Sequence, residues 1–199
     1  RHAPTGTQAE IYRAAAVVQA SGATNAVEHL QKLLAVDRSM EVVPLLILAE
    51  RQLTLRRFAG AERTLARILD SYPARPLTRE WLGIAQMGLG NAKEAIEQVR
   101  QALQRNPERP ESQFNMGLLL SGEKQREEAL SHLTKATALR SNFVPAWFHL
   151  GRIHAEQGRL DEAVTCYRRA LEIDPTHTRA YVALGKILRQ QGKHAEAAR

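Results

Sequence analysis

Residues 147–175 read WFHLGRIHAEQGRLDEAVTCYRRALEIDP, and this stretch predicts two helices that meet at a turn. Apolar side chains recur at helical spacing on both sides of Gly158, and the β-branched residues that favour strands are few. Gly158 can adopt the left-handed backbone conformation that ends a helix, and Pro175 stops the second helix. The stretch therefore predicts a helical hairpin.

The skeleton of this hairpin recurs along the chain at intervals of 34 residues. Three columns share the interval: glycine at Gly83, Gly117, Gly151 and Gly185; alanine at Ala61, Ala95, Ala129, Ala163 and Ala197; and a bulky apolar residue at Leu48, Leu82, Met116, Leu150 and Leu184. A fixed period of this length is typical of a solenoid, in which each unit buries its apolar face against its neighbours.

Small residues in these columns have a mechanical role. Gly151 and Ala163 are expected to let the two helices of a hairpin approach closely. The turn between the helices carries glycine in three repeats, at Gly90, Gly158 and Gly192. Arg56 and Lys124 stand at the same place in two other repeats, so these turns are predicted to be weaker.

The stretch at 147–175 resembles the tetratricopeptide repeat (TPR) family, matching its tryptophan, leucine-glycine, alanine, aromatic, alanine and proline columns almost throughout. The resemblance implies an all-α fold, a right-handed superhelical solenoid of antiparallel helix pairs that spans residues 1–199 as one domain. It predicts these units: a degenerate repeat at 8–41, repeats at 42–75, 76–109, 110–143 and 144–177, and a truncated repeat at 178–199.

The truncated repeat leaves the apolar edge of the helix expected at 181–188 without a second helix to cover it. We therefore expect fraying there, or self-association through this end of the chain. Because the chain begins without Met and stops inside a helical pattern, we also expect it to be part of a longer protein.

Composition narrows the classes of partner. The net charge is +7 and the pI is about 10, but the basic residues are interleaved with acidic and polar ones. Since clustering is what phosphate binding requires, nucleic acid is not the expected partner. The longest apolar run, at 42–49, is too short for a membrane span. The single cysteine excludes an internal disulfide, which fits a reducing compartment such as the cytoplasm and leaves the periplasm open.

Catalytic and metal-binding patterns are missing from the sequence. His149 and His154 are five residues apart, so they do not share a helix face as an i, i+4 metal pair would. Cys166 has no histidine close in sequence and is expected to be a structural thiol. We therefore predict a non-enzymatic protein with no cofactor and no metal.

The first helix of each hairpin is expected to line the concave face of the solenoid. The predicted peptide-binding groove consists of Trp81, Ile84, Phe114, Asn115, Leu118, Phe148, His149, Arg152, Val182, Lys186 and Arg189. Its apolar members lie outside the packing columns, which favours a peptide ligand with apolar anchors. Truncation of Phe114 or Phe148 is then expected to weaken binding and leave helicity nearly intact. The alternative is that these side chains pack against one another, a flanking domain or a second copy.

Charge along this groove is predicted to be graded. Glu50 and Glu80 belong to early repeats, whereas the late repeats carry the basic residues Arg152, Arg179, Lys186 and Arg189. An acidic stretch of a ligand is therefore expected at the late repeats. The family has a known carboxylate clamp, which is built from a set of lysines and asparagines. We reject it here, because Asn115 is the only residue of this chain that matches a member of that set.

The function predicted from these patterns is a non-catalytic scaffold that binds a protein or peptide segment in its concave groove. Two alternatives stay open: the recognition arm of a larger glycosyltransferase or sulfotransferase, and an assembly factor for a bacterial pilus or an exopolysaccharide export system. Both depend on sequence outside this chain.

Overall fold

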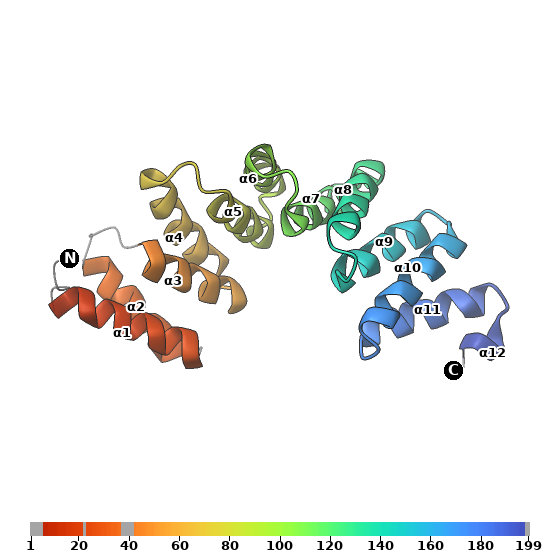
Figure 1. Ribbon diagram of the computed structural model, residues 1–199, viewed down its shortest axis with the longest axis horizontal. Coiled ribbons are helices and arrows are strands. Elements are labelled where there is room, and N and C mark those ends of the chain that lie inside the picture. Colours follow the sequence, from red (N-terminus) through yellow and green to blue (C-terminus); the bar gives the residue numbers. More distant parts are fainter. Residues whose placement is uncertain (1–5, 22, 37–41, 198–199) are drawn as a thin grey trace. The chain divides into compact units, whose positions relative to one another are not determined.

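The computed structural model describes residues 6–21, 23–36 and 42–197, and every regular element among them is an α-helix (Figure 1). The all-α prediction is confirmed for this part of the chain. Contacts between helices divide the chain into two compact units, Arg1–Arg105 and Asn106–Arg199. Residues 37–41 of the expected degenerate repeat and residues 198–199 of the truncated repeat lie outside the described residues.

In its described residues the N-terminal unit has six helices, and each one packs against the helix that follows it in the unit. Their bounds are α1 (Gly6–Ser21), α2 (Thr24–Val36), α3 (Val42–Thr54), α4 (Phe58–Ser71), α5 (Pro76–Leu89) and α6 (Ala92–Arg105). One hydrophobic core extends from Ile11 on α1 to Ala85 on α5. The degenerate first pair is therefore part of the same core as the regular pairs.

The described part of the C-terminal unit also has six helices, the last of them a single turn. Their bounds are α7 (Pro110–Gly122), α8 (Arg126–Leu139), α9 (Val144–Glu156), α10 (Leu160–Ile173), α11 (Thr178–Gln190) and α12 (His194–Ala197). Short turns make α7–α8 and α9–α10 into hairpins, and α8 and α10 each pack against the first helix of the next pair. Two first helices, α7 and α11, also contact α9.

The glycine column brings the two helices of a hairpin into contact, as the sequence predicts. A Cβ atom added to Gly117 would lie 2.6 Å from Cγ of Leu133, and one added to Gly151 would lie 2.8 Å from Cε1 of Tyr167. Gly185 differs, because the nearest atom to such a Cβ is 3.8 Å away. Close packing at this column therefore depends on a full second helix.

The turns within the pairs from α3–α4 to α11–α12 share one hydrogen-bonding pattern. At Gly158, φ is +75°, and the next amide, of Arg159, donates to the carbonyl oxygen of His154 over 2.9 Å. This is the bond that closes a helix in the Schellman motif. Arg56 and Lys124 adopt the same left-handed conformation, with φ of 56° and 62°, although they carry a Cβ atom. The backbone thus keeps its geometry where the glycine is missing.

A Lys124→Gly variant is expected to be more stable than the wild type. Glycine removes a left-handed backbone strain of about 1–2 kcal/mol, but it also raises the conformational entropy of the unfolded chain, which offsets part of this stabilisation. We therefore expect the free energy of unfolding to rise by about 0.5 kcal/mol. Urea denaturation followed by circular dichroism measures the change. Gly158→Lys, the inverse replacement one repeat later, should lower stability. A loss of stability in Lys124→Gly would contradict the role assigned to this turn.

Candidate functional site

The predicted groove residues fall in both units and have different surroundings. Trp81 and Ile84 lie on α5 of the N-terminal unit, where Trp81 packs against the hydrophobic core. The other predicted residues lie on α7, α9 and α11 of the C-terminal unit. Contacts between first helices bring several of these together, so the site is described there.

A row of aromatic rings connects the first helices of the C-terminal unit. Phe114 on α7 lies 5.7 Å from His149 on α9, measured between ring centroids, and 5.1 Å from Phe143. Phe148 lies 5.3 Å from His149 and 5.2 Å from His177, which precedes α11. We call Phe143, Phe114, His149, Phe148 and His177 the aromatic row. Two predicted ligand anchors, Phe114 and Phe148, thus already have aromatic partners within the protein.

His149 is held neutral at the middle of the aromatic row. Burial, together with the nearby positive charges of Arg152 and Arg179, lowers its pKa to about 4. Among the described residues, its buried Nδ1 atom has no hydrogen-bond partner. The side chain therefore packs as an uncharged ring at neutral pH.

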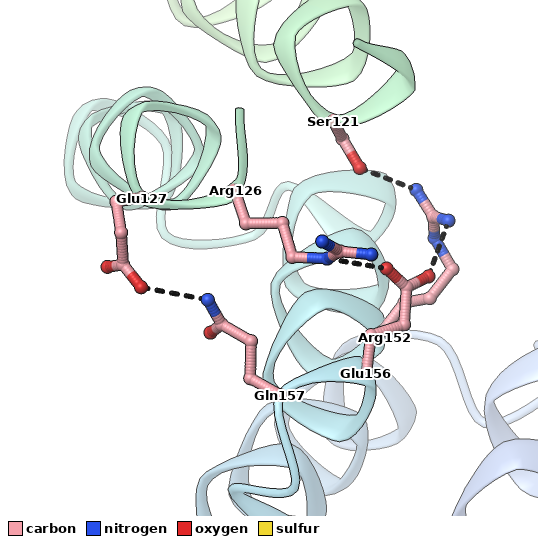
Figure 2. A network of polar contacts seen from close by, with 6 residues as sticks. All are labelled: Ser121, Arg126, Glu127, Arg152, Glu156 and Gln157. Carbon is pink, nitrogen blue, oxygen red and sulfur yellow. Dashed lines mark hydrogen bonds and ion pairs between the residues drawn. The ribbon is translucent and has the colours of Figure 1, made fainter. Parts of the chain in front are cut away.

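Arg152 is the centre of a polar network that joins α7, α8 and α9 (Figure 2). Its guanidinium group donates to Glu156 Oε1 over 2.9 Å and to Ser121 Oγ over 3.2 Å. The other oxygen of Glu156 lies 3.5 Å from Nε of Arg126. One carboxylate therefore pairs with two arginines, so this group of three side chains keeps a net positive charge.

A second part of the same network connects the start of α8 to the end of α9. Glu127 accepts a hydrogen bond from Gln157 over 2.8 Å (Figure 2). It also accepts one from Arg159 over 2.8 Å. Glu127 is also in the first turn of α8, where a carboxylate favours the helix dipole. These bonds fix the end of α9, and with it the position of Arg152.

A pocket of about 370 Å³ lies between α9, α10 and α11. It is lined by Arg152, Ala155, Glu156, Leu160, Tyr167, Ala183, Lys186, Ile187 and Gln190. Two predicted groove residues, Arg152 and Lys186, thus come from successive first helices to one pocket. Burial raises the pKa of Tyr167 to about 12, so its hydroxyl stays protonated. The pocket combines an apolar lining with polar groups of both charges.

The predicted residues of α11 are the most accessible ones. Val182 is 66% exposed, and Lys186 and Arg189 are also exposed. Neither basic residue forms an ion pair within the part of the chain that the structure describes. Tyr181, on the same helix, is 49% exposed. Self-association through this end stays a prediction.

Two polar residues expected on the groove are buried instead. Glu80 is only 3% exposed, so the expectation that it contributes a negative charge to the early part of the groove is wrong. Asn115 is 9% exposed, and both residues have interactions inside the protein. Leu118 is half-buried. The repeat predicted that Glu80, Asn115 and Leu118 lie on first helices, but it did not predict how deeply their side chains are buried.

Sequence reasoning missed Glu156, Ser121 and Arg126, which surround Arg152. Ser121 and Arg126 flank the turn of the preceding hairpin, so their sequence distance from Arg152 hides the contact. It also missed Ala155 and Ala183, which line the pocket on two facing helices. Two alanines on neighbouring first helices were the sequence feature that could have indicated this pocket.

Chemistry beyond binding finds little support in this arrangement. Burial raises the pKa of Cys166 to about 11, which agrees with a structural thiol. The described residues contain no cluster of three histidine, cysteine or acidic side chains placed to hold a metal ion. None of the described helices has the length and apolar character that a membrane span requires.

Models of known families match most of the chain from residue 46 onward. A model described as "Tetratricopeptide repeat" matches residues 46–110 and 82–121, and a second one of that description matches 120–168. A model described as "TPR repeat" matches residues 151–192. No protein in the curated set is similar enough in sequence to count as a match.

Solved structures with a similar fold include three helical-repeat proteins. TTC0263, a TPR protein of Thermus thermophilus, is 22% identical with a TM-score of 0.73, over 90% of this chain and 98% of that one. MamA is 24% identical with a TM-score of 0.68, over 80% and 90%. YrrB, described as a TPR protein with an unusual peptide-binding site, is 21% identical with a TM-score of 0.67, over 87% and 89%.

Proposed function

The chain belongs to the tetratricopeptide repeat family, and we propose that it is a non-catalytic scaffold that binds a peptide segment on its C-terminal unit. The proposed binding surface, here called the candidate face, consists of the predicted residues Phe114, Leu118, Phe148, His149, Arg152, Val182, Lys186 and Arg189. A protein-interaction role is what the fold supports in general. The peptide and its orientation are our inference.

One observation carries the proposal: the pocket to which α9 and α11 each contribute a basic residue of the candidate face. An extended peptide that crosses successive first helices would place one side chain there. YrrB, which has a similar fold, is described as having a peptide-binding site, and this supports the proposal that the present fold binds a peptide.

Charge favours an acidic ligand near α11. Lys186 and Arg189 are exposed there without acidic partners among the described residues, and Arg179 at the start of the helix is exposed as well. Such groups attract an oppositely charged partner and speed its association. We therefore propose that the acidic part of the peptide lies over α11.

A peptide library displayed on phage and selected against the immobilised chain tests this function. We expect acidic, apolar-containing sequences, and about tenfold weaker binding of the corresponding synthetic peptides to a Lys186→Glu, Arg189→Glu variant, a loss near 1.4 kcal/mol. Isothermal titration calorimetry at two salt concentrations gives the affinities, and the loss should shrink at high salt.

The matched control is Lys135→Glu, Lys193→Glu, which makes the same change of charge at exposed residues outside the candidate face. It should bind nearly as well as the wild type. If selected peptides bind both double variants equally well, or lose affinity only in the control, the candidate face is not the binding site.

A further inference from the structure

The pocket between α9, α10 and α11 has an apolar lining made mostly by small and branched side chains. Ala155 on α9 faces the same space as Ala183 and Ile187 on α11, and Leu160 and Tyr167 of α10 complete the lining. Tyr167 is 3% exposed, so its ring is fixed in the core. Two alanines on neighbouring first helices leave the room that a ligand side chain could fill.

The charged side chains of the pocket differ in whether they already form ion pairs within the protein. Arg152 is paired with Glu156, and Glu156 is also paired with Arg126 (Figure 2). Lys186 has no ion pair within the described residues. At the arginines an incoming carboxylate would have to compete with Glu156, which already pairs with both of them, whereas Lys186 has no acidic partner among the described residues.

Resting on the proposed function, we propose that this pocket receives a bulky apolar side chain of the peptide, and that an adjacent carboxylate pairs with Lys186. Glu156 sets the direction, because it already pairs with the arginines on that side of the pocket and leaves Lys186 as the cation that is unpaired within the described part of the chain. Apolar anchors in such pockets provide most of the affinity of an interface, and the ion pair adds selectivity. Lys186 is thus the residue that determines specificity.

Three short peptides separate the parts of this proposal. Acetyl-Phe-Glu-amide carries a side-chain carboxylate, acetyl-Gly-Phe a terminal one, and acetyl-Phe-Gln-amide none. In NMR titrations of the isotope-labelled full chain at about millimolar concentrations, the peptides should shift the backbone amides of residues around Ala155, Ala183 and Ile187. At least one acidic peptide should bind about threefold more tightly than the amide, as expected for an exposed ion pair. Tighter binding of acetyl-Phe-Glu-amide would identify a side-chain carboxylate as the ligand group, and tighter binding of acetyl-Gly-Phe would identify a terminal one.

Lys186→Glu should remove or reverse this preference, and Lys193→Glu, an equal charge change in the turn after α11, should keep it. Ala183→Leu should abolish binding of all three peptides while its spectrum stays dispersed. Lys186→Glu changes an exposed side chain and keeps the test decisive if Ala183→Leu fails to fold.

Equal binding of the three peptides, an unchanged preference in Lys186→Glu, or no shift around the pocket would overturn the proposal. The proposed function would survive these results if the phage-selected peptides still lost affinity in the Lys186→Glu, Arg189→Glu variant. It would fail if those longer peptides bound that variant no more weakly than the Lys135→Glu, Lys193→Glu control.

Discussion

Gly151→Ala is expected to unfold at a clearly lower urea concentration than the wild type. The added Cβ atom would lie 2.8 Å from Cε1 and 2.9 Å from Cδ1 of Tyr167, closer than packed carbon atoms approach. Tyr167 cannot move aside easily, because it is buried and its ring lies 5.8 Å from that of Phe148. Overpacking of this kind costs about 1–3 kcal/mol. Urea denaturation followed by circular dichroism gives the loss.

Two other glycines of the C-terminal unit are matched controls. Gly185 occupies the same column of the repeat, but its nearest neighbour to an added Cβ is 3.8 Å away, and Gly122 has none within 4 Å. Alanine is the better helix former by roughly 0.5–1 kcal/mol, so both replacements should be neutral or slightly stabilising. If Gly185→Ala were as damaging as Gly151→Ala, contact with the second helix would not be the reason for the column.

Phe148→Ala is expected to lower the free energy of unfolding by about 2–3 kcal/mol, at or below the lower limit of the roughly 3–5 kcal/mol found for buried phenylalanine, because the ring is only half-buried. The variant loses ring contacts with His149, Tyr167 and His177, whose centroids lie 5.2–5.8 Å away. This revises the sequence-based expectation that Phe148 can be truncated with the helices nearly intact. The same denaturation experiment measures the loss.

Val182→Ala is the control for that experiment. Val182 lies on the next first helix and is 66% exposed, so its truncation should change stability by less than about 0.5 kcal/mol. Affinities of Phe148→Ala need correction for the folded fraction before any loss is assigned to the ligand. A Phe148→Ala protein as stable as the wild type would show that the aromatic row adds nothing to the fold and that Phe148 is free for a ligand.

The periodic features of the fold could be predicted from the sequence because each recurs at one interval. The paired helices, the left-handed turn at Gly158 and the close approach at Gly151 all follow from columns of equivalent residues. The family resemblance is confirmed by the matching repeat models. Local geometry of this kind is determined within a single hairpin.

The contacts between repeats could not be predicted in the same way. Equivalent columns place Phe114 and Phe148 on neighbouring helices, but they do not tell which ring each will contact. The same limit applies to Glu80, whose burial depends on neighbours that the period does not specify. Such contacts depend on side-chain rotamers and on residues particular to one repeat.

The aromatic row has a consequence for how the C-terminal unit opens. In a linear array of repeats, cooperativity depends on the coupling energy between neighbours relative to the instability of each repeat alone. His149 contacts Phe114 of the preceding hairpin, and Phe148 contacts His177 at the start of the following helix. The α9–α10 hairpin therefore cannot detach without removing aromatic partners on both sides. The unit should open as one block, so a bound peptide would meet a preformed surface and lose little affinity to ordering it.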